Sequence, residues 1–284
     1  MKVPIIENIP ILTSSLLYMN PHLILISGAG SGIGLHLAKT LLQKGHELLL
    51  LDLNINSLEQ NFQESQTLKI LEGNVSKPET WFAAVEIAKE MGRPFSHLFN
   101  CAGVIRPGFV SDFELSDIDF HLDINTKGSI LGTKIIGAEM RPQGFGHIIN
   151  ISSLAGLAPV SGISLYTASK FAIRGFSLAA GAEFKKYGVN ISVVCPDLVS
   201  TPMLDLQLDY PDETKLTFSG PKKVLQPEDV TRVLLILMEK PKPLVCIPES
   251  RGLLAKIAGT WPWIAEMFRA DLEKRGEKAI QKMK

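Results

Sequence analysis

Short apolar runs alternate with longer segments of helical period along most of this chain, and this alternation constrains the fold more than any other feature. Short apolar runs bounded by turn residues are typical of buried parallel strands, and 3.6-residue periodicity between them indicates crossover helices. The predicted strands are residues 23–27, 48–51, 68–71, 97–100, 147–151, 190–194 and 244–247. The predicted helices are residues 33–44, 77–91, 117–140 and 165–187. The pattern predicts an α/β fold with a mostly parallel, seven-stranded sheet and helices on both of its faces.

A glycine-rich turn follows the first predicted strand and opens the first predicted helix. It reads Ser27-Gly28-Ala29-Gly30-Ser31-Gly32-Ile33-Gly34. In this position backbone N–H groups and the positive end of a helix can hold a pyrophosphate, which favours a doubly wound, Rossmann-type dinucleotide fold. Asp52 ends the next strand, where a carboxylate can accept both adenosine ribose hydroxyls and repel a 2′-phosphate. Because Ala29, Ser31 and Leu53 are not basic, we expect NAD as the cofactor rather than NADP.

The 284 residues divide into one large unit and two extensions. We expect an N-terminal extension over residues 1–21, a single Rossmann-type catalytic domain over 22–250, and a C-terminal extension over 251–284. Residues 196–226 carry four prolines and little periodicity, which predicts a lid. The C-terminal extension has eight basic and four acidic side chains, and its pattern predicts helix.

Composition excludes several classes of function. Lys plus Arg number 29 and Asp plus Glu number 29, so no net field draws the chain to nucleic acid. The three cysteines form no CxxC pair and the six histidines have no metal-ligand spacing, so we expect no catalytic metal and a reducing, cytoplasmic location. No apolar run is long enough to cross a membrane. Residues 9–19 imitate the apolar part of a signal peptide, but no small-residue cleavage site follows.

Three polar residues in the second half of the chain have the pattern of a proton-transfer site. Tyr166 and Lys170 are four residues apart in a predicted helix, so both project from one face. A nearby ammonium and a positively charged nicotinamide would favour the phenolate of Tyr166. Ser153 follows the fifth predicted strand, where its hydroxyl can bind a substrate carbonyl or hydroxyl, with Ser152 as the adjacent competitor.

Taken in order, the glycine turn, the Asn100-Cys101-Ala102-Gly103 loop, Ser153 and Tyr166-x-x-x-Lys170 resemble the motifs of the classical short-chain dehydrogenase/reductase family. The resemblance covers about residues 22–250. It implies a catalytic tetrad of Asn125, Ser153, Tyr166 and Lys170, in which Asn125 bends a helix and holds a water for a proton relay. The family spacing to the tyrosine selects Ser153 over Ser152.

The resemblance also implies which residues contact the cofactor. They are Gly28, Ser31, Gly32, Ile33, Gly34, Asp52, Leu53, Asn74, Val75, Asn100, Ala102, Gly103, Tyr166, Lys170, Val199 and Thr201. Two positions depart from the family pattern. Asn74 stands where the family usually has Asp, and Asp197 follows Pro196 where the family most often has Gly. Asp197 brings an acidic side chain close to the expected nicotinamide end, which leaves the local backbone shape and the substrate preference open.

We therefore expect an NAD-dependent oxidoreductase that interconverts a secondary alcohol and a ketone by hydride transfer. The residues expected near the pocket are mostly apolar, namely Leu154, Leu157, Val160, Leu204, Leu206 and Leu208. They favour a small hydrophobic substrate such as a steroid, a retinoid or a lipid, although the same residues could simply pack the lid. One alternative is an NADPH-dependent ketoacyl or keto-sphingoid reductase, against which Asp52 argues. The other is a non-catalytic NAD-binding regulator or scaffold.

The C-terminal extension contains an apolar stripe. It consists of Leu253, Leu254, Ile257, Trp261, Trp263, Ile264, Met267 and Phe268. The stripe could contact a membrane surface peripherally, or it could cover the substrate pocket or a partner subunit, and the second interpretation is favoured because such stripes are usually core. Pro262 is expected to interrupt the helix. The family resemblance implies a homodimer or homotetramer formed through the helices at residues 117–140 and 165–187.

Overall fold

A single parallel sheet organises the computed structural model, which describes residues 22–220 and 223–283. The strand order is β3-β2-β1-β4-β5-β6-β7, so the prediction of a doubly wound sheet of seven strands is confirmed. The strands are β1 Leu23–Ser27, β2 Glu47–Asp52, β3 Leu68–Glu72, β4 Phe95–Asn100, β5 Gly146–Ile151, β6 Val189–Pro196 and β7 Leu244–Ile247. Each predicted strand lies within two residues of the observed one. The predicted N-terminal extension and its apolar segment lie outside the described residues.

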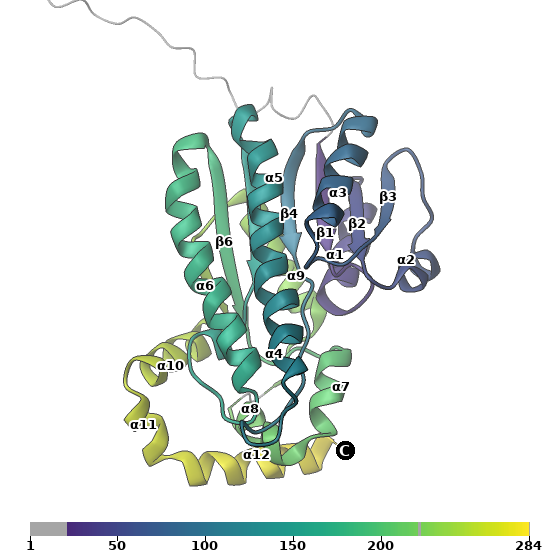
Figure 1. Ribbon diagram of the computed structural model, residues 1–284. Helices are drawn as coiled ribbons and strands as arrows, with labels where there is room; N and C mark the ends of the chain where they lie inside the picture. The colour runs from purple at the N-terminus through teal and green to yellow at the C-terminus, as the bar shows by residue number, and fades with distance from the viewer. Residues whose placement is uncertain (1–21, 221–222, 284) are drawn as a thin grey trace, which may run out of the picture.

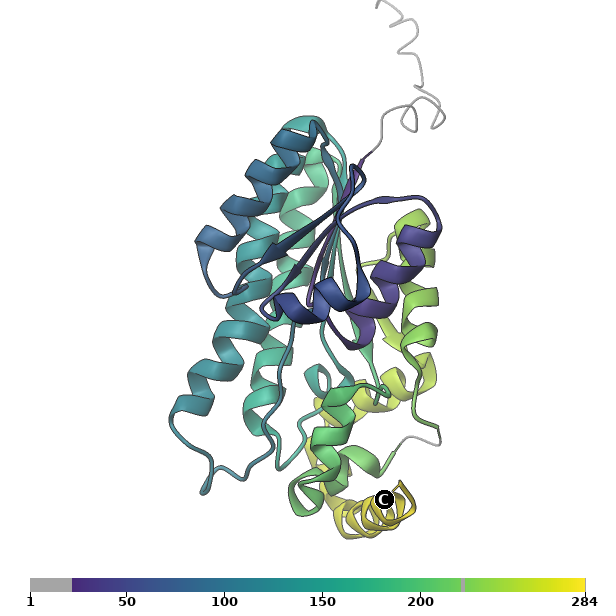
Figure 2. The ribbon, with the colours of Figure 1, turned by 90° about the vertical axis from the view of Figure 1, so that its right-hand side faces the viewer.

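Helices cover both faces of the sheet (Figures 1 and 2). On one face, α1 Gly32–Gln43 and α9 Pro227–Glu239 pack on the strands, and on the other lie α3 Pro78–Met91, α5 Ser129–Gln143 and α6 Ser164–Phe184. Alternate side chains of β1 pack into the hydrophobic cores on the two faces of the sheet, because successive residues of a strand point to opposite faces. Ile24 and Ile26 join the core beneath α1 and α9, whereas Leu23 and Leu25 join the core beneath α3 and α5.

The predicted helix over residues 117–140 is divided in the structure. It consists of α4 Ser116–His121, a π-helical turn over Leu122–Gly128, and α5. The wider π turn contains Asn125 and turns its side chain toward the loop after β4, where it bonds both backbone groups of Val104. The periodicity predicted one continuous helix here, whereas the family resemblance implied that Asn125 bends it, and the π turn lies at that residue.

Several helices were absent from the sequence prediction. They are α2 Ile55–Asn61, α7 Pro202–Leu208, α8 Pro211–Phe218 and α9. The first three have seven or eight residues, which is too short for a periodic pattern to stand out. The predicted irregular lid over residues 196–226 therefore contains α7 and α8, each with a proline in its first turn. There the missing proline N–H costs no helical hydrogen bond.

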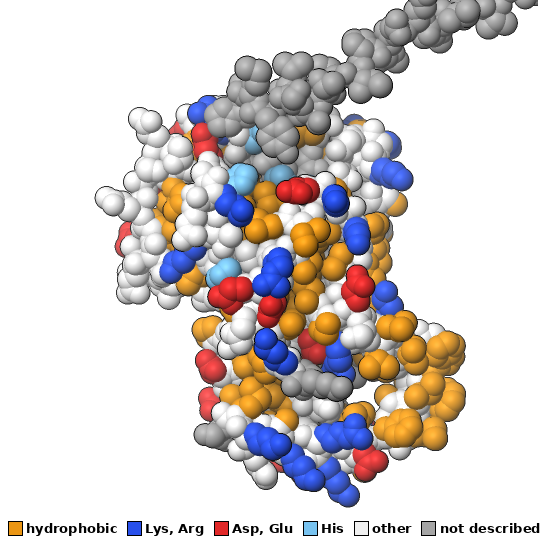
Figure 3. Space-filling model, turned by 180° about the vertical axis from the view of Figure 1, so that it is seen from behind, with side chains coloured by type: hydrophobic (Ala, Val, Ile, Leu, Met, Phe, Trp, Pro, Cys, Tyr) orange, Lys and Arg blue, Asp and Glu red, His pale blue; other side chains and the backbone are white. Residues whose placement is uncertain are grey.

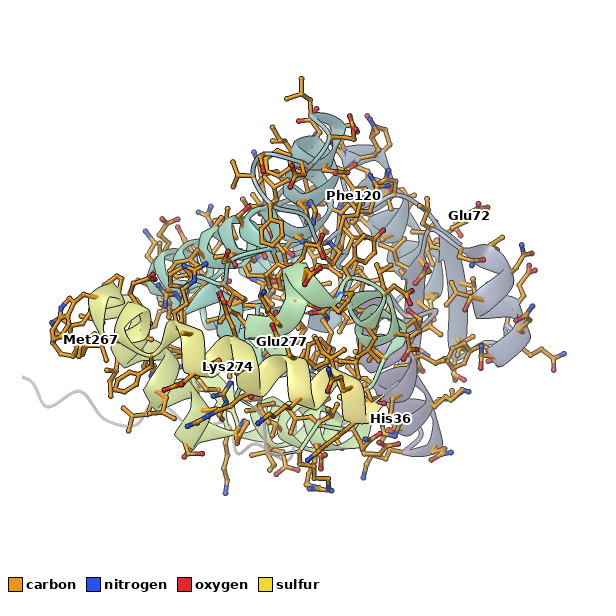
Figure 4. All side chains as sticks on the ribbon, turned by 90° about the horizontal axis from the view of Figure 1, so that it is seen from below. His36, Glu72, Phe120, Met267, Lys274 and Glu277 are labelled. Carbon is orange, nitrogen blue, oxygen red and sulfur yellow. The ribbon has the colours of Figure 1, made fainter. Side chains whose placement is uncertain are left out.

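The C-terminal extension forms α10 Glu249–Thr260, α11 Pro262–Met267 and α12 Arg269–Met283. These helices, yellow in Figure 1, cross the end of the molecule beyond the carboxyl ends of the strands. α12 packs tightly against the lid at Gly276, where a Cβ would clash with the carbonyl oxygen of Lys215 in α8. Ile280 is buried with Leu198 and Phe218. The extension is therefore packed onto the lid, and Figure 4 shows α12 lying across this face. Within the described part of the chain, none of the helices has the length and apolar character of a membrane span.

Two histidines, the half-buried His97 of β4 and the buried His147 of β5, face each other in the sheet. His97 and His147 are register partners, and their ring centroids are 5.8 Å apart. Burial, with a smaller contribution from neighbouring histidines, lowers the pKa of His97 to about 4 and that of His147 to about 3. In the unfolded chain both should have the ordinary histidine pKa of about 6.5. Below about pH 6.5 the unfolded chain binds these protons, whereas the folded chain does not until the pH is near 4. The unfolding free energy is therefore at its full value above about pH 6.5 and decreases as the pH falls toward 4.

Lowering the pH from about 7 to about 5 is therefore expected to cost about 2 kcal/mol of unfolding free energy for each imidazole. A His147→Gln variant can keep the hydrogen bond that joins Nε2 to Ser192, 2.7 Å long, but it cannot be protonated. We expect it to lose about half as much stability as the parent over this interval. Urea unfolding followed by tryptophan fluorescence at both pH values measures the difference. Equal losses in parent and variant would contradict the assignment.

Candidate functional site

The glycine-rich turn lies between β1 and α1 at one end of a cavity of about 1050 Å³. Gly28 has a φ of +70°, and a Cβ there would lie 2.6 Å from the backbone of Ala102. A Cβ on Gly34 would lie 2.1 Å from the carbonyl oxygen of Gly28. Both positions therefore require glycine, since the turn packs tightly against itself and against the loop after β4. Ser31 precedes α1 without capping it through its side chain, so the first N–H groups of this helix remain available to an anion.

Asp52 stands beside the turn, at the carboxyl end of β2. Its Oδ2 accepts a hydrogen bond from the backbone N–H of Gly30 at 2.8 Å, and its Oδ1 accepts one from Asn54 at 3.0 Å. The basic side chains in the described lining of the cavity are Lys170, Arg251 and Arg275, and all come from other segments of the chain. This end of the cavity thus offers a carboxylate for ribose hydroxyls and no cation for a 2′-phosphate. The residues present fit a dinucleotide.

Most of the predicted cofactor residues are gathered in this one cavity. Its lining includes Gly28, Ser31, Gly32, Ile33, Gly34, Asp52, Leu53, Asn74, Val75, Ala102, Gly103, Tyr166, Lys170, Val199 and Thr201. Asn100 is the exception. It is buried below the cavity, where its Nδ2 donates to Asn150 at 2.7 Å and to the carbonyl oxygen of Ser129 at 3.4 Å. Its side chain therefore links β4 to β5 and α5.

Three polar side chains of the predicted tetrad meet where β5 and α6 approach the cavity. Ser153, Tyr166 and Lys170 all line it. Lys170 is 4% exposed, and its Nζ lies 5.4 Å from the centroid of the Tyr166 ring and donates to the carbonyl oxygen of Ile151 at 3.1 Å. Burial raises the pKa of Tyr166 to about 12, against the opposing effect of the Ser153 hydroxyl, and burial lowers the pKa of Lys170 to about 8. At neutral pH the pair is therefore a phenol beside an ammonium.

Asn125 is the fourth predicted member, and it lies behind the cavity wall rather than in it. Its Oδ1 accepts from the N–H of Val104 at 2.8 Å, and its Nδ2 donates to the carbonyl of Val104 and to Ser169 Oγ. A Cβ on Gly103 would lie 3.3 Å from both Asn125 Oδ1 and Lys170 Nζ. Because Gly103 has no side chain, these two groups flank a common space.

The other end of the cavity is mostly apolar and is formed by the lid and the C-terminal extension. Of the apolar residues expected near the pocket, Leu154, Val160, Leu204 and Leu206 line it, whereas Leu157 and Leu208 pack elsewhere in the core. The C-terminal extension contributes Leu254, Ile257, Ile264, Phe268 and Leu272, together with Asp271 and Arg275. The part of the chain that the structure describes has no group of three His, Cys, Asp or Glu side chains that could hold a metal ion.

An ion pair that sequence reasoning missed joins α10 of the C-terminal extension to the segment after β6, at the apolar end of the cavity. Arg251 of α10 donates from Nε to Oδ2 of Asp197 at 2.9 Å, and the Asp197 side chain is only 9% exposed. The guanidinium also lies against Gly220 at the end of the lid, where a Cβ would come within 1.9 Å of it. The sequence offered one signal, because Asp197 departs from the usual glycine, but its partner is 54 residues away.

Comparisons with known proteins agree with this geometry. The family profile described as short chain dehydrogenase matches residues 22–209. A 3-alpha-(or 20-beta)-hydroxysteroid dehydrogenase of Mycobacterium bovis is 29% identical over 214 residues, which is 75% of this chain and 80% of the relative. An uncharacterized oxidoreductase of Staphylococcus aureus is 26% identical over 219 residues, 76% of this chain and 90% of the relative.

Solved structures show the same fold. Levodione reductase has a TM-score of 0.72 at 24% identity, covering 80% of this chain and 95% of that one. 4-Hydroxyisoleucine dehydrogenase complexed with NADH has a TM-score of 0.71 at 21% identity, covering 79% and 96%. With the family profile matched over most of the sheet and its site, this chain belongs to the short chain dehydrogenase family of oxidoreductases.

Proposed function

We propose that this protein is an NAD-dependent dehydrogenase that interconverts a hydrophobic secondary alcohol and its ketone. The observation that carries the proposal is the single cavity in which Ser153, Tyr166 and Lys170 stand between a glycine-rich turn and an apolar chamber. The carboxylate of Asp52 at the turn supports NAD as the cofactor. The apolar chamber supports a steroid, retinoid or lipid-like substrate, and the hydroxysteroid dehydrogenase similarity agrees with that class.

The glycine turn, Asp52, Val199 and Thr201 would hold the cofactor, which when bound supplies the hydride acceptor or donor. The protein's own residues handle the proton. Ser153 binds the substrate oxygen through its hydroxyl, and Tyr166 shares that oxygen and carries the proton to or from it. In ketone reduction the protonated phenol is already the required form, because burial holds the pKa of Tyr166 at about 12. In alcohol oxidation the phenol must first release its proton, which the Lys170 ammonium favours.

Lys170 and Asn125 complete the path of the proton. The Lys170 Nζ is held by the Ile151 carbonyl and cannot turn freely away from Tyr166. Asn125, fixed by three hydrogen bonds, presents its carbonyl oxygen toward the space beside Gly103 that Lys170 also faces. We infer that a water bound there would pass the proton from Lys170 toward solvent.

The direct test mixes the purified protein with NAD and a panel of hydrophobic secondary alcohols, and follows the absorbance of the reduced nicotinamide. The reverse reaction uses the matching ketones and NADH. We expect turnover with at least one steroid, retinoid or long-chain alcohol. Binding of NAD by calorimetry without any turnover would instead support a binding protein, and absence of coenzyme binding would refute the proposal altogether.

The Asp197–Arg251 ion pair is expected to hold the substrate end of the cavity closed. An Arg251→Ala variant would leave a nearly buried carboxylate without its partner and free the end of the lid. We expect the KM for the substrate to rise about tenfold, a loss of about 1.4 kcal/mol, with a lower unfolding temperature. Asp197→Asn is the companion variant, since its one remaining side-chain oxygen can still accept from Arg251 Nε, whereas the oxygen that accepts from the N–H of Leu198 is replaced by an NH2 group. An unchanged KM in Arg251→Ala would show that the pair does not shape the pocket.

A further inference from the structure

Six large apolar side chains gather on the outer corner of the C-terminal extension. This apolar patch consists of Leu253, Leu254, Trp261, Trp263, Met267 and Phe268, and each of them is at least half exposed. Figure 3 shows hydrophobic side chains clustered over this corner, and in Figure 4 Met267 points away from the molecule at the end of α11. A contiguous apolar patch of this kind on a folded protein marks a surface that contacts something else.

The patch does not serve as core within the chain. The buried residues of α10, α11 and α12 are only Gly252, Gly276 and Ile280. Pro262 begins α11 and separates it from α10, so the chain turns at Trp261 and presents both tryptophans outward. The extension is thus attached to the lid by α12, while its other corner is left for a partner.

The patch is continuous with the wall of the active-site cavity. Leu254 and Phe268 belong to both, because each is more than half exposed and each lines the cavity that contains Tyr166. Ile264 and Leu272 continue the same apolar wall inward. A hydrophobic molecule could therefore pass from whatever covers the patch to the catalytic tyrosine along apolar side chains.

Positive charge lies along α10 and α12, the helices on either side of α11. Among the residues of α10, α11 and α12, five cations form no ion pair, namely Lys256, Lys274, Arg275, Lys278 and Lys282, against only two such acids, Glu249 and Asp271. Figure 3 shows basic side chains along α12 next to the apolar corner, and Figure 4 labels Lys274 on this helix. Each basic residue close to an anionic lipid surface adds electrostatic attraction. Tryptophan favours the boundary between headgroups and acyl chains.

We propose that the apolar patch binds the surface of a bilayer that contains anionic lipids. We further propose that a lipid-like alcohol or ketone enters the cavity directly from that bilayer at Leu254 and Phe268. The second step rests on the proposed function, whereas the first does not. A second copy of this chain fits the surface less well, because a twofold contact through the patch would bring the two sets of unpaired cations together.

The binding step is tested by flotation of the full-length protein with vesicles of phosphatidylcholine alone or mixed equally with phosphatidylglycerol. We expect flotation with the anionic vesicles. The double variant Trp263→Ser/Met267→Ser should bind at least about tenfold more weakly, as should Lys274→Glu/Lys278→Glu. Phe82→Ser is the matched control, since Phe82 is 58% exposed on α3, and it should bind like the parent. If the parent does not bind, or if all variants bind equally, the proposal is refuted.

Two further measurements separate the other outcomes. If sedimentation velocity finds a dimer that Trp263→Ser/Met267→Ser dissociates, and the parent ignores vesicles, then a second copy covers the patch and the proposal is wrong. For the entry step, the double variant should turn over a short, water-soluble secondary alcohol like the parent, but a vesicle-embedded alcohol at least about fivefold more slowly. Equal rates on both would refute entry from the bilayer. Vesicle binding without turnover of any alcohol would refute the proposed function and leave the membrane surface in place.

Discussion

Replacing Tyr166 with phenylalanine is expected to lower kcat by about a thousandfold or more, with the affinity for NAD changed by less than about threefold. The substitution removes only the hydroxyl that carries the proton. The ring is packed in an apolar cluster with Ile105, Ile163 and Met203, and phenylalanine fills the same volume, so the fold and the cofactor end should be unaffected. Steady-state kinetics and titration calorimetry with NAD measure the two quantities.

The matched control is Tyr187→Phe. Tyr187 ends the turn after α6, where its ring contacts Phe184 and Arg141 away from the cavity lining. We expect this variant to keep parental kcat. Turnover by Tyr166→Phe at the parental rate would remove Tyr166 from the proton-transfer step, and the reaction would then need another acid. Loss of NAD affinity together with kcat would instead indicate that the phenol holds the cofactor.

The centre of the sheet could be predicted from the sequence because strands such as β1 and β2 are buried on both faces. All five residues of β1 are buried, and β2 has one residue that is not, so residues 23–26 and 48–51 are continuous apolar runs that end at a glycine turn and at Asp52. The glycine turn and Asp52 could be placed side by side because each follows or ends a parallel strand, and the carboxyl ends of parallel strands lie at the same edge of the sheet. Ser153, Tyr166 and Lys170 were predictable as a group because their spacing is local to β5 and α6.

The substrate end of the site could not be predicted in this way. Its walls come from short helices without a visible period and from contacts between distant segments, such as Arg251 with Asp197 and Ile280 with Leu198. The apolar stripe of the extension indicated that it could cover the pocket or a partner subunit, and Leu254, Ile257, Ile264 and Phe268 of that stripe line the cavity. Asn100, in contrast, was predicted to contact the cofactor. Its side chain donates to Asn150 and to Ser129 and does not line the cavity, and no local sequence pattern distinguishes such a structural asparagine from one that faces the cofactor.

Cofactor choice is expected to depend on the carboxylate of Asp52. We expect the parent to bind NAD at least about a hundredfold more tightly than NADP, because a 2′-phosphate would meet a like charge at a cost of several kcal/mol. Leu53 is 64% exposed on the rim beside it, so an arginine there can reach a phosphate without disturbing the core. The double variant Asp52→Ser/Leu53→Arg should therefore prefer NADP. Calorimetric dissociation constants for both coenzymes, with each protein, provide the measurement.

Asp52→Asn separates charge from shape in this test. Its amide oxygen can still accept from the N–H of Gly30, so the turn should keep its conformation while the repulsion of a phosphate disappears. We expect NADP binding to tighten in this variant and NAD binding to weaken, because the ribose contacts lose their charge assistance and one acceptor oxygen becomes an NH2 donor. A parent protein that binds NADP as tightly as NAD would contradict the role given to Asp52. It would then favour an NADPH-dependent reductase built on the same Tyr166 and Lys170.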